Sequence, residues 1–115
     1  MMESSTAVLA IKALDLLDQR AAVTAENIAN AGTPGYRPLR LSFEDALKAA
    51  AAQGDDAVRQ LQPTVERTVT NTGNGELRAD LEMATASATA GRYSALVEVL
   101  NRELQIDSLA ITGNS

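Results

Sequence analysis

The stretch NIANAGTPGYRP, residues 27–38, decides the fold, because a long helical pattern runs into it and stops within a few residues. Asn30 and Gly32 are residue types that accept the left-handed conformation in which many helices end. Pro34 and Gly35 match the central positions of a type II turn, since proline fixes the first φ and glycine supplies a positive second φ. We therefore expect the helix to end here and the chain to reverse.

Three further features of this stretch could hold the turn in one conformation. Thr33 precedes a proline, which disfavours helical backbone. Tyr36 could bury its ring while its hydroxyl binds a polar partner. Asn27 and Asn30 lie three residues apart on one helix face, where their amides can bind the backbone of the turn. An ordinary helix-to-loop junction fits these residues too; the competing hypothesis is a fixed elbow shaped for contact with neighbouring subunits. The elbow motif comprises Asn27, Asn30, Thr33, Pro34, Gly35 and Tyr36.

Upstream of the elbow, apolar residues recur with a helical period. One row repeats every seven residues and a second row follows three residues later. The rows are Ala7, Leu14, Ala21 and Ile28, and Ala10, Leu17 and Thr24. Ser4, Ser5 or Thr6 can cap the first turn. Residues 1–31 are predicted to contain an N-terminal helix whose apolar surface is wider than one partner helix would cover.

The C-terminal third shows a stricter repeat. Its first heptad row is Met83, Ala90, Val97, Leu104 and Ile111, and its second is Ala86, Tyr93 and Leu100. This pattern predicts a coiled-coil-like helix over residues 81–115, with Asp80 as its N-cap and Gly113 as its stop. Glu82, Glu98 and Glu103 are interpreted as solvated positions of this helix.

The middle segment, residues 32–80, is mixed. Residues 42–53 predict a short helix capped by Ser42, with Glu44 and Asp45 in its first turn and Gly54 as its stop. Residues 64–70 alternate in polarity, which is typical of an edge strand or an extended arm. Residues 71–76 predict a turn or loop, and no role is assigned to residues 50–70. The expected fold is mainly α: two long terminal helices pack as a coiled-coil-like pair around a short irregular middle, as one structural unit.

The composition excludes several classes of function. The chain has no histidine, which is the commonest general base and metal ligand, and no cysteine. The net charge is −5 without a basic tract, so nucleic acid is a poor partner. No nucleophile is paired with a base. We therefore expect no enzyme, no cofactor and no metal site. The charged N-terminus predicts neither a cleavable signal peptide nor direct membrane insertion.

The motif NIANAGTPGYR closely resembles the N-terminal signature shared by flagellar rod and hook proteins. That signature has Ala-Asn, two variable residues and Thr-Pro-Gly-Tyr, followed by Lys or Arg. Three more stretches resemble the proximal rod members of this family in the basal body: LSFEDAL (41–47), GNGELRADLEMA (73–84) and RYSALVEVLNREL (92–104).

The resemblance implies a structural subunit without chemistry of its own. It implies export by the flagellar type III apparatus without leader cleavage, and polymerisation through the terminal helices into part of the drive-shaft tube across the periplasm. The implied partners are other rod proteins, the basal-body ring and its adaptor proteins, in homo- and hetero-oligomers. The predicted subunit-interface residues are Leu14, Leu17, Ile28, Tyr93, Val97, Leu100 and Leu104.

Two alternatives remain open at this point. The same seven residues would equally serve the core of an intramolecular helical hairpin. The acidic charge and the amphipathic helices would also suit a helical cytoplasmic adaptor or a type III secretion chaperone.

Overall fold

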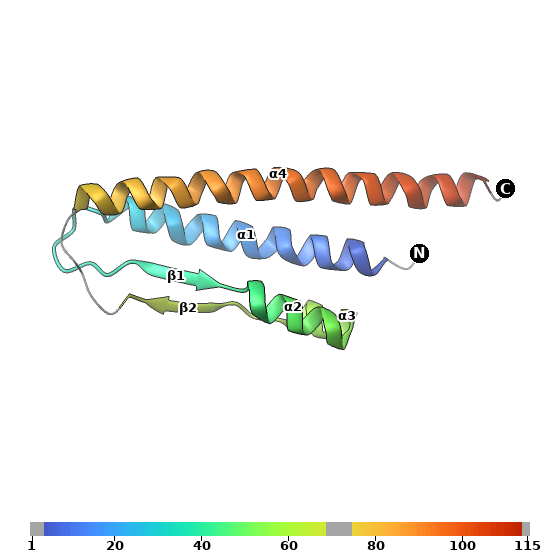
Figure 1. Cartoon of the computed structure of the whole chain (residues 1–115), viewed down its shortest axis with the longest axis horizontal. Coiled ribbons are helices and arrows are strands. Elements are labelled where there is room, and N and C mark those ends of the chain that lie inside the picture. The colour runs from blue at the N-terminus through green and yellow to red at the C-terminus, as the bar shows by residue number, and fades with distance from the viewer. Residues whose placement is uncertain (1–3, 69–74, 114–115) are drawn as a thin grey trace.

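The computed structural model describes residues 4–68 and 75–113, and it describes side chains for 4–68 and 79–106. The molecule is an elongated three-layer structure with extents of 63 × 25 × 15 Å. A long C-terminal helix, a shorter N-terminal helix and a strand pair continued by two short helices lie along the same axis (Figure 1). The predicted mainly α fold, with paired terminal helices and a short middle, is confirmed.

Helix α1, Ser5–Ala29, begins at an N-cap formed by Ser4. The Ser4 hydroxyl accepts a hydrogen bond of 3.0 Å from the backbone N–H of Ala7, which satisfies one of the free donors of the first turn. The buried face of α1 has many small side chains: three alanines and one threonine line it beside Leu16 and Leu17. Such a face allows a second helix to approach closely.

The end of α1 differs from the prediction in one respect. Asn30 has φ −106°, and the described residues include no non-glycine residue with positive φ. Instead, the backbone tightens: the N–H of Ala31 bonds the carbonyl of Ile28, and the N–H of Thr33 bonds that of Asn30. The last carbonyls of a helix often accept hydrogen bonds from a residue in the left-handed conformation. Here these tighter turns and the Asn30 amide supply the hydrogen bonds instead.

The predicted reversal at Pro34 and Gly35 is confirmed. Gly35 has φ +77°, and the N–H of Tyr36 donates to the carbonyl of Thr33 at 3.1 Å. This is the hydrogen bond of a four-residue turn, with glycine where the positive φ is required.

The chain then forms an antiparallel strand pair. β1, Leu39–Ser42, pairs with β2, Thr64–Arg67, in the register Leu39 to Arg67 and Ser42 to Thr64. The strand predicted within residues 64–70 therefore exists, and its partner is the segment after the elbow. That partner was missed because a strand of four residues carries little periodic signal.

Two short helices separate the strands. α2, Glu44–Gln53, ends at Gly54, as predicted, and α3, Asp55–Gln60, follows at once. Ser42 is not the cap of α2, because its backbone is paired in β1; Phe43 occupies the cap position, and its N–H donates to the Glu44 carboxylate at 3.3 Å. Residues 50–70, unassigned from sequence, thus contain the end of α2, all of α3 and β2.

Helix α4, Gly75–Gly113, runs antiparallel to α1 and extends beyond its N-terminal end (Figure 1). Asp80 lies inside this helix and is not its N-cap. The residues before it, Glu76 to Ala79, are good helix formers, so the helix begins earlier. Of the loop predicted at 71–76, residues 71–74 lie outside the described part of the chain. The structure describes this helix up to Gly113, the predicted stop, which is also the last residue described.

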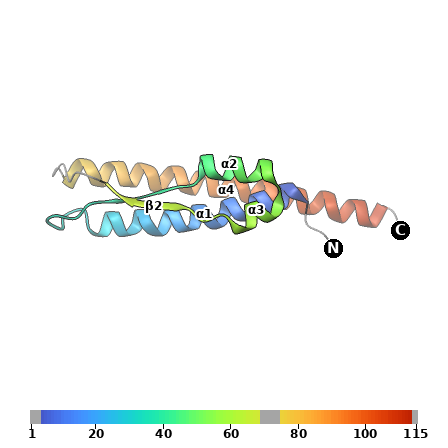
Figure 2. The ribbon, with the colours of Figure 1, turned by 90° about the horizontal axis from the view of Figure 1, so that it is seen from below.

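The core lies where α1 meets the strand layer. One buried cluster consists of Leu16, Leu17, Leu41 and Phe43, with Leu96 of α4 packed against it. A second joins Val8 of α1 to Ala50 of α2 and Val58 of α3. Seen from below, the strands and short helices lie over both long helices (Figure 2). Full burial of each large apolar side chain contributes about 1.5–3 kcal/mol to the free energy of unfolding.

Candidate assembly interface

The elbow is held by a buried amide. Asn27 is 1% exposed, and its Oδ1 accepts hydrogen bonds from the Tyr36 hydroxyl at 2.8 Å and from the backbone N–H of Leu39 at 2.9 Å. Its Nδ2 donates to the carbonyl of Leu39 at 2.8 Å and to the Glu82 carboxylate at 3.1 Å. All four hydrogen-bonding capacities of this amide are used. Asn27 therefore ties α1 to the elbow, to β1 and to α4.

Asn30 acts more locally. Its Nδ2 donates to the carbonyl of Glu26 at 2.9 Å, and its Oδ1 accepts from the Thr33 hydroxyl at 3.2 Å. Pro34 and Gly35, at the tip of the turn, are exposed. Asn30 thus binds only the last turn of α1 and the adjoining turn, whereas Asn27 also reaches β1 and α4.

Glu82 corrects the sequence interpretation. It is not solvated: it is 1% exposed, and its carboxylate accepts hydrogen bonds from Asn27 and from the Arg40 guanidinium, with which it forms an ion pair. Together Asn27, Arg40 and Glu82 form what we call the polar latch. A buried carboxylate is tolerated only when it is paired in this way. Glu98 is exposed and Glu103 half-buried.

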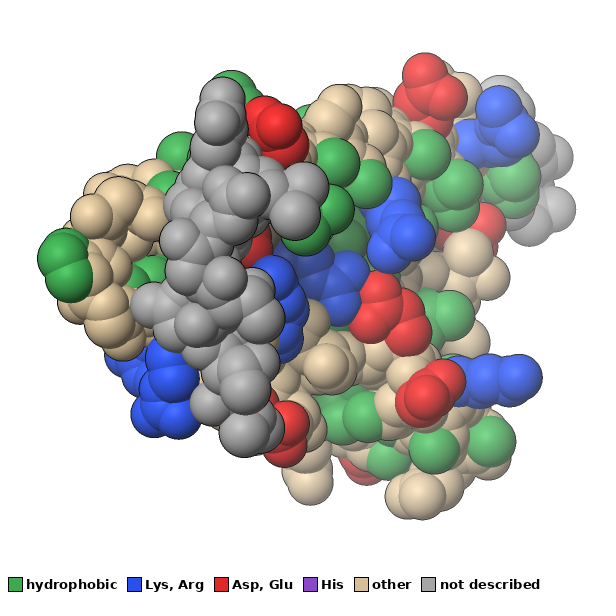
Figure 3. Space-filling view, turned by 60° about the vertical axis from the view of Figure 1, so that its left-hand side comes forward, with side chains coloured by type: hydrophobic (Ala, Val, Ile, Leu, Met, Phe, Trp, Pro, Cys, Tyr) green, Lys and Arg blue, Asp and Glu red, His purple; other side chains and the backbone are tan. Residues whose placement is uncertain are grey.

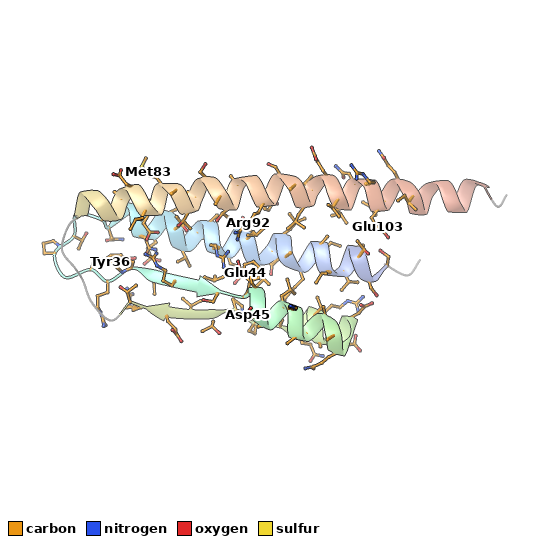
Figure 4. The ribbon with its side chains drawn as sticks, in the orientation of Figure 1. Tyr36, Glu44, Asp45, Met83, Arg92 and Glu103 are labelled. Atoms are coloured by element: carbon orange, nitrogen blue, oxygen red, sulfur yellow. The ribbon has the colours of Figure 1, made fainter. Side chains whose placement is uncertain are left out.

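The buried row of α4 is therefore displaced by one residue from the predicted one. Glu82 and Thr89 are buried, and Leu96 and Glu103 are half-buried. In the predicted row, Met83 is 61% and Leu104 53% exposed, and Met83 points away from α1 (Figure 4). One residue corresponds to a rotation of about 100° around the helix axis. The heptad period was correct and the first predicted row is displaced, whereas Ala86 and Leu100 of the second predicted row are half-buried.

An open groove lies between α1 and α4, and of the displaced row Ala90 is in its lining. This groove has a volume of about 400 Å³, and small and apolar side chains dominate its walls. We call it the two-helix groove. Its lining comprises Leu17, Asp18, Ala21, Ala25 and Ile28 from α1 and Ala86, Thr89, Ala90, Tyr93 and Ser94 from α4.

The predicted interface residues divide between the core and this groove. Leu17 is 2% exposed and belongs to the buried cluster, although it reaches the groove floor. Ile28 and Tyr93 line the groove and are 36% and 41% exposed. Leu104 is exposed, while Leu14, Val97 and Leu100 are half-buried. The structure brings Leu17, Ile28 and Tyr93 together around one hollow.

A second groove lies between α1, α2 and α4, nearer the N-terminal end of α1. It measures about 460 Å³, and its walls include Leu9, Phe43, Leu47, Leu96 and Val99. The sequence signal for it was the pair Leu96 and Val99, which lie outside the two predicted heptad rows.

A charge cluster borders this second groove. Arg20 donates to both oxygens of the Glu44 carboxylate, at 2.7 and 2.8 Å, and also binds the carbonyl of Leu41. Its guanidinium lies 4.6 Å from the centre of the Phe43 ring. Arg92 of α4 forms an ion pair with the same carboxylate at 3.3 Å (Figure 4). Basic and acidic side chains also lie next to one another near the middle of the face shown in Figure 3. The hydrogen bonds from Arg20 lower the pKa of Glu44 from 4.5 to about 2.

Among the described residues, no group of three or more acidic, histidine or cysteine side chains could hold a metal ion. Within the same part of the chain, no helix combines the length and the apolar character needed to cross a membrane.

Two comparisons with known proteins bear on this geometry. A family model described as flagella basal body rod protein matches residues 9–37, which covers most of α1 and the elbow. Over 57 residues the chain is 42% identical to the flagellar basal body rod protein FlgB of Escherichia coli (strain K12), and equally to that of Shigella flexneri. The aligned segment covers 50% of this chain and 41% of each relative, so the chain spans less than half the length of these proteins in the match.

The matched residues contain the elbow turn and Asn27, which binds it. Both comparisons confirm the resemblance inferred from the sequence: over residues 9–37 this chain is similar to the flagellar basal-body rod protein family, and over a segment of 57 residues it is similar to FlgB.

Proposed function

We propose that this chain is a structural subunit of the bacterial flagellar basal-body rod, located in its proximal part, and that its terminal helices polymerise into the drive-shaft tube. The observation that carries the proposal is the two-helix groove. Its lining includes Ile28 of α1 and Tyr93 of α4, two large apolar side chains that are 36% and 41% exposed in the single chain. A folded chain leaves such a row open when another protein covers it.

The groove suits contact between helices. Its walls contain Ala21, Ala25, Ala86 and Ala90, and small side chains let backbones approach closely. Leu104 and Ile106 extend the apolar surface of α4 toward its C-terminal end, with exposed fractions of 53% and 54%. In this proposal neighbouring subunits cover Leu14, Ile28, Tyr93, Val97, Leu100 and Leu104, whereas Leu17 serves the core of the single chain.

The partners belong to the same proposal. They are further copies of the chain, other rod proteins, and the ring and adaptor proteins of the basal body, reached after export by the flagellar apparatus without leader cleavage. The support is the resemblance of the elbow and of α1 to the rod family.

The proposal is tested by placing a charge in the groove. The gene is deleted in its own bacterium and complemented with wild type, with Ala90→Glu, or with the control Ala49→Glu. Both alanines are exposed helical positions, but only Ala90 lines the groove, whereas Ala49 lies on α2 outside both grooves. Far-ultraviolet circular dichroism verifies that all three chains keep the same helix content.

Isolated envelopes are then inspected for rods by electron microscopy, and wild-type basal bodies are analysed for the chain by mass spectrometry. We expect rings without rods in the deletion strain and in Ala90→Glu, and normal rods in Ala49→Glu, because a carboxylate in an apolar contact must be desolvated without a partner. Intact rods in the deletion strain, with the chain missing from basal bodies, would favour a cytoplasmic adaptor or secretion chaperone instead.

A further inference from the structure

Most of the more apolar row of α4 faces outward, with Met83, Ala90 and Leu104 exposed and Val97 half-buried. This is the reverse of what hydrophobicity alone favours. The buried or half-buried row is Glu82, Thr89, Leu96 and Glu103, and the neighbouring row is Met83, Ala90, Val97 and Leu104. Rotation of α4 by one position would exchange the two rows. A specific interaction must therefore hold the observed phase.

The polar latch is the interaction that depends on this phase. Glu82 receives the Arg40 guanidinium on Oε1 and the Asn27 amide on Oε2, so both oxygens are bound at 1% exposure. Arg40 lies on β1 and Asn27 on α1, so the carboxylate is held by two elements that are themselves joined through Leu39. Turning α4 would separate Glu82 from both partners.

We propose that the Arg40–Glu82 pair is a positioning device that sets the rotational phase of α4 and thereby keeps the row from Met83 to Leu104 on the open side. The charge of Glu82 makes its burial depend on the ion pair. Paired, Glu82 is stable in the interior; unpaired, it is driven to solvent. Because the two rows adjoin, a turn that exposes Glu82 brings Met83 toward α1. The inference concerns the free chain and holds whatever occupies the groove.

The test uses the absence of cysteine from the chain. Single cysteines are introduced as Met83→Cys or Leu104→Cys, at side chains that are 61% and 53% exposed, and their rates of modification by a thiol reagent are measured. Each is combined with Arg40→Met, which removes the guanidinium and keeps an apolar stem. Arg37→Met is the matched control, because Arg37 is an exposed arginine three residues away on the same segment, outside the latch.

We expect Arg40→Met to slow modification at both cysteines several-fold with helix content unchanged, and Arg37→Met to leave the rates unaltered. The double variant Arg40→Met with Glu82→Leu should restore the wild-type rates, since a leucine at position 82 is stable when buried and removes the reason to rotate. A purely structural role for Arg40 predicts no such rescue.

Two results would overturn the inference. Unchanged modification in a helical Arg40→Met chain would mean that packing, through Leu96 for example, sets the phase without the latch. Faster modification together with lost helix content would mean that the pair stabilises the fold as a whole and does not select a phase.

Discussion

The two sides of α1 differ in how completely the chain covers them. On the side of the strands, Leu16 and Leu17 are 0% and 2% exposed, and Asn27 forms four hydrogen bonds to three other segments. On the side of the two-helix groove, Ile28 and Tyr93 remain 36% and 41% exposed. The comparison teaches that the chain completes one face of its helix by itself and leaves the other apolar and open.

The largest effect is expected in the covered face. Leu16→Ala removes a fully buried side chain from the core cluster and should lower the free energy of unfolding by about 2–5 kcal/mol. Ile11→Ala, at a side chain that is 44% exposed, should cost less than about 1 kcal/mol. Urea unfolding followed by circular dichroism measures both. Equal losses would show that Ile11 is as well covered as Leu16, and the contrast between the two sides would be lost.

The next effect separates the latch from the turn. Asn27→Ala removes the side-chain partner of the Leu39 N–H and carbonyl and one of the two partners of the Glu82 carboxylate. It should lower the free energy of unfolding by about 2 kcal/mol. Asn30→Ala loses hydrogen bonds only within its own turn. It should lower the free energy of unfolding by at most about 1 kcal/mol. Thermal unfolding of the two variants side by side provides the comparison. A larger loss for Asn30→Ala would contradict the central position that we assign to Asn27.

A third prediction concerns the tip of the elbow. Gly35→Val forces a β-branched residue into φ +77°. It should lower the free energy of unfolding by about 1–2 kcal/mol. Gly32→Val is the control, because Gly32 has open space around a Cβ and no positive φ. Chemical unfolding should therefore distinguish the two glycines although neither substitution meets a neighbouring atom. In cells, Gly35→Val should also impair rod assembly, which a count of rods would reveal.

The smallest effect is a pH dependence on the covered face. The pKa of Glu44 is lowered in the folded state, so its contribution to stability is present above the unfolded value of 4.5 and is lost as pH falls toward about 2. The Glu44 side chain is 51% exposed, so screening reduces this contribution to at most about 1 kcal/mol. Unfolding curves of wild type and Glu44→Gln should converge as pH decreases from 5 to 2. A constant difference across that range would show that the pair with Arg20 contributes nothing.

Local chemistry accounts for what could be predicted. The cap at Ser4, the turn with Gly35 at positive φ and the stop at Gly54 each depend on residues within four positions, which one sequence displays directly. The hydrogen bond from Tyr36 to Asn27 spans nine residues and was expected only as a polar partner of unknown identity.

The burial of Glu82 shows why the rest could not be predicted. Its partners lie 42 and 55 residues away along the chain, on β1 and α1. A helical pattern treats an isolated glutamate as solvated, because burial of an unpaired carboxylate is costly. Only the folded chain brings Arg40 close enough to reverse that preference, and the predicted contact row of α4 was wrong for the same reason.

The sequence by itself determined that two long helices exist, where the first one ends and how the chain turns, because helix periods, caps and glycine conformations are local properties. The tertiary structure decided which face of α4 is buried and which apolar row stays open. That choice depends on an ion pair between distant segments, and such a pair acquires its energy only after the fold has brought its two charges together.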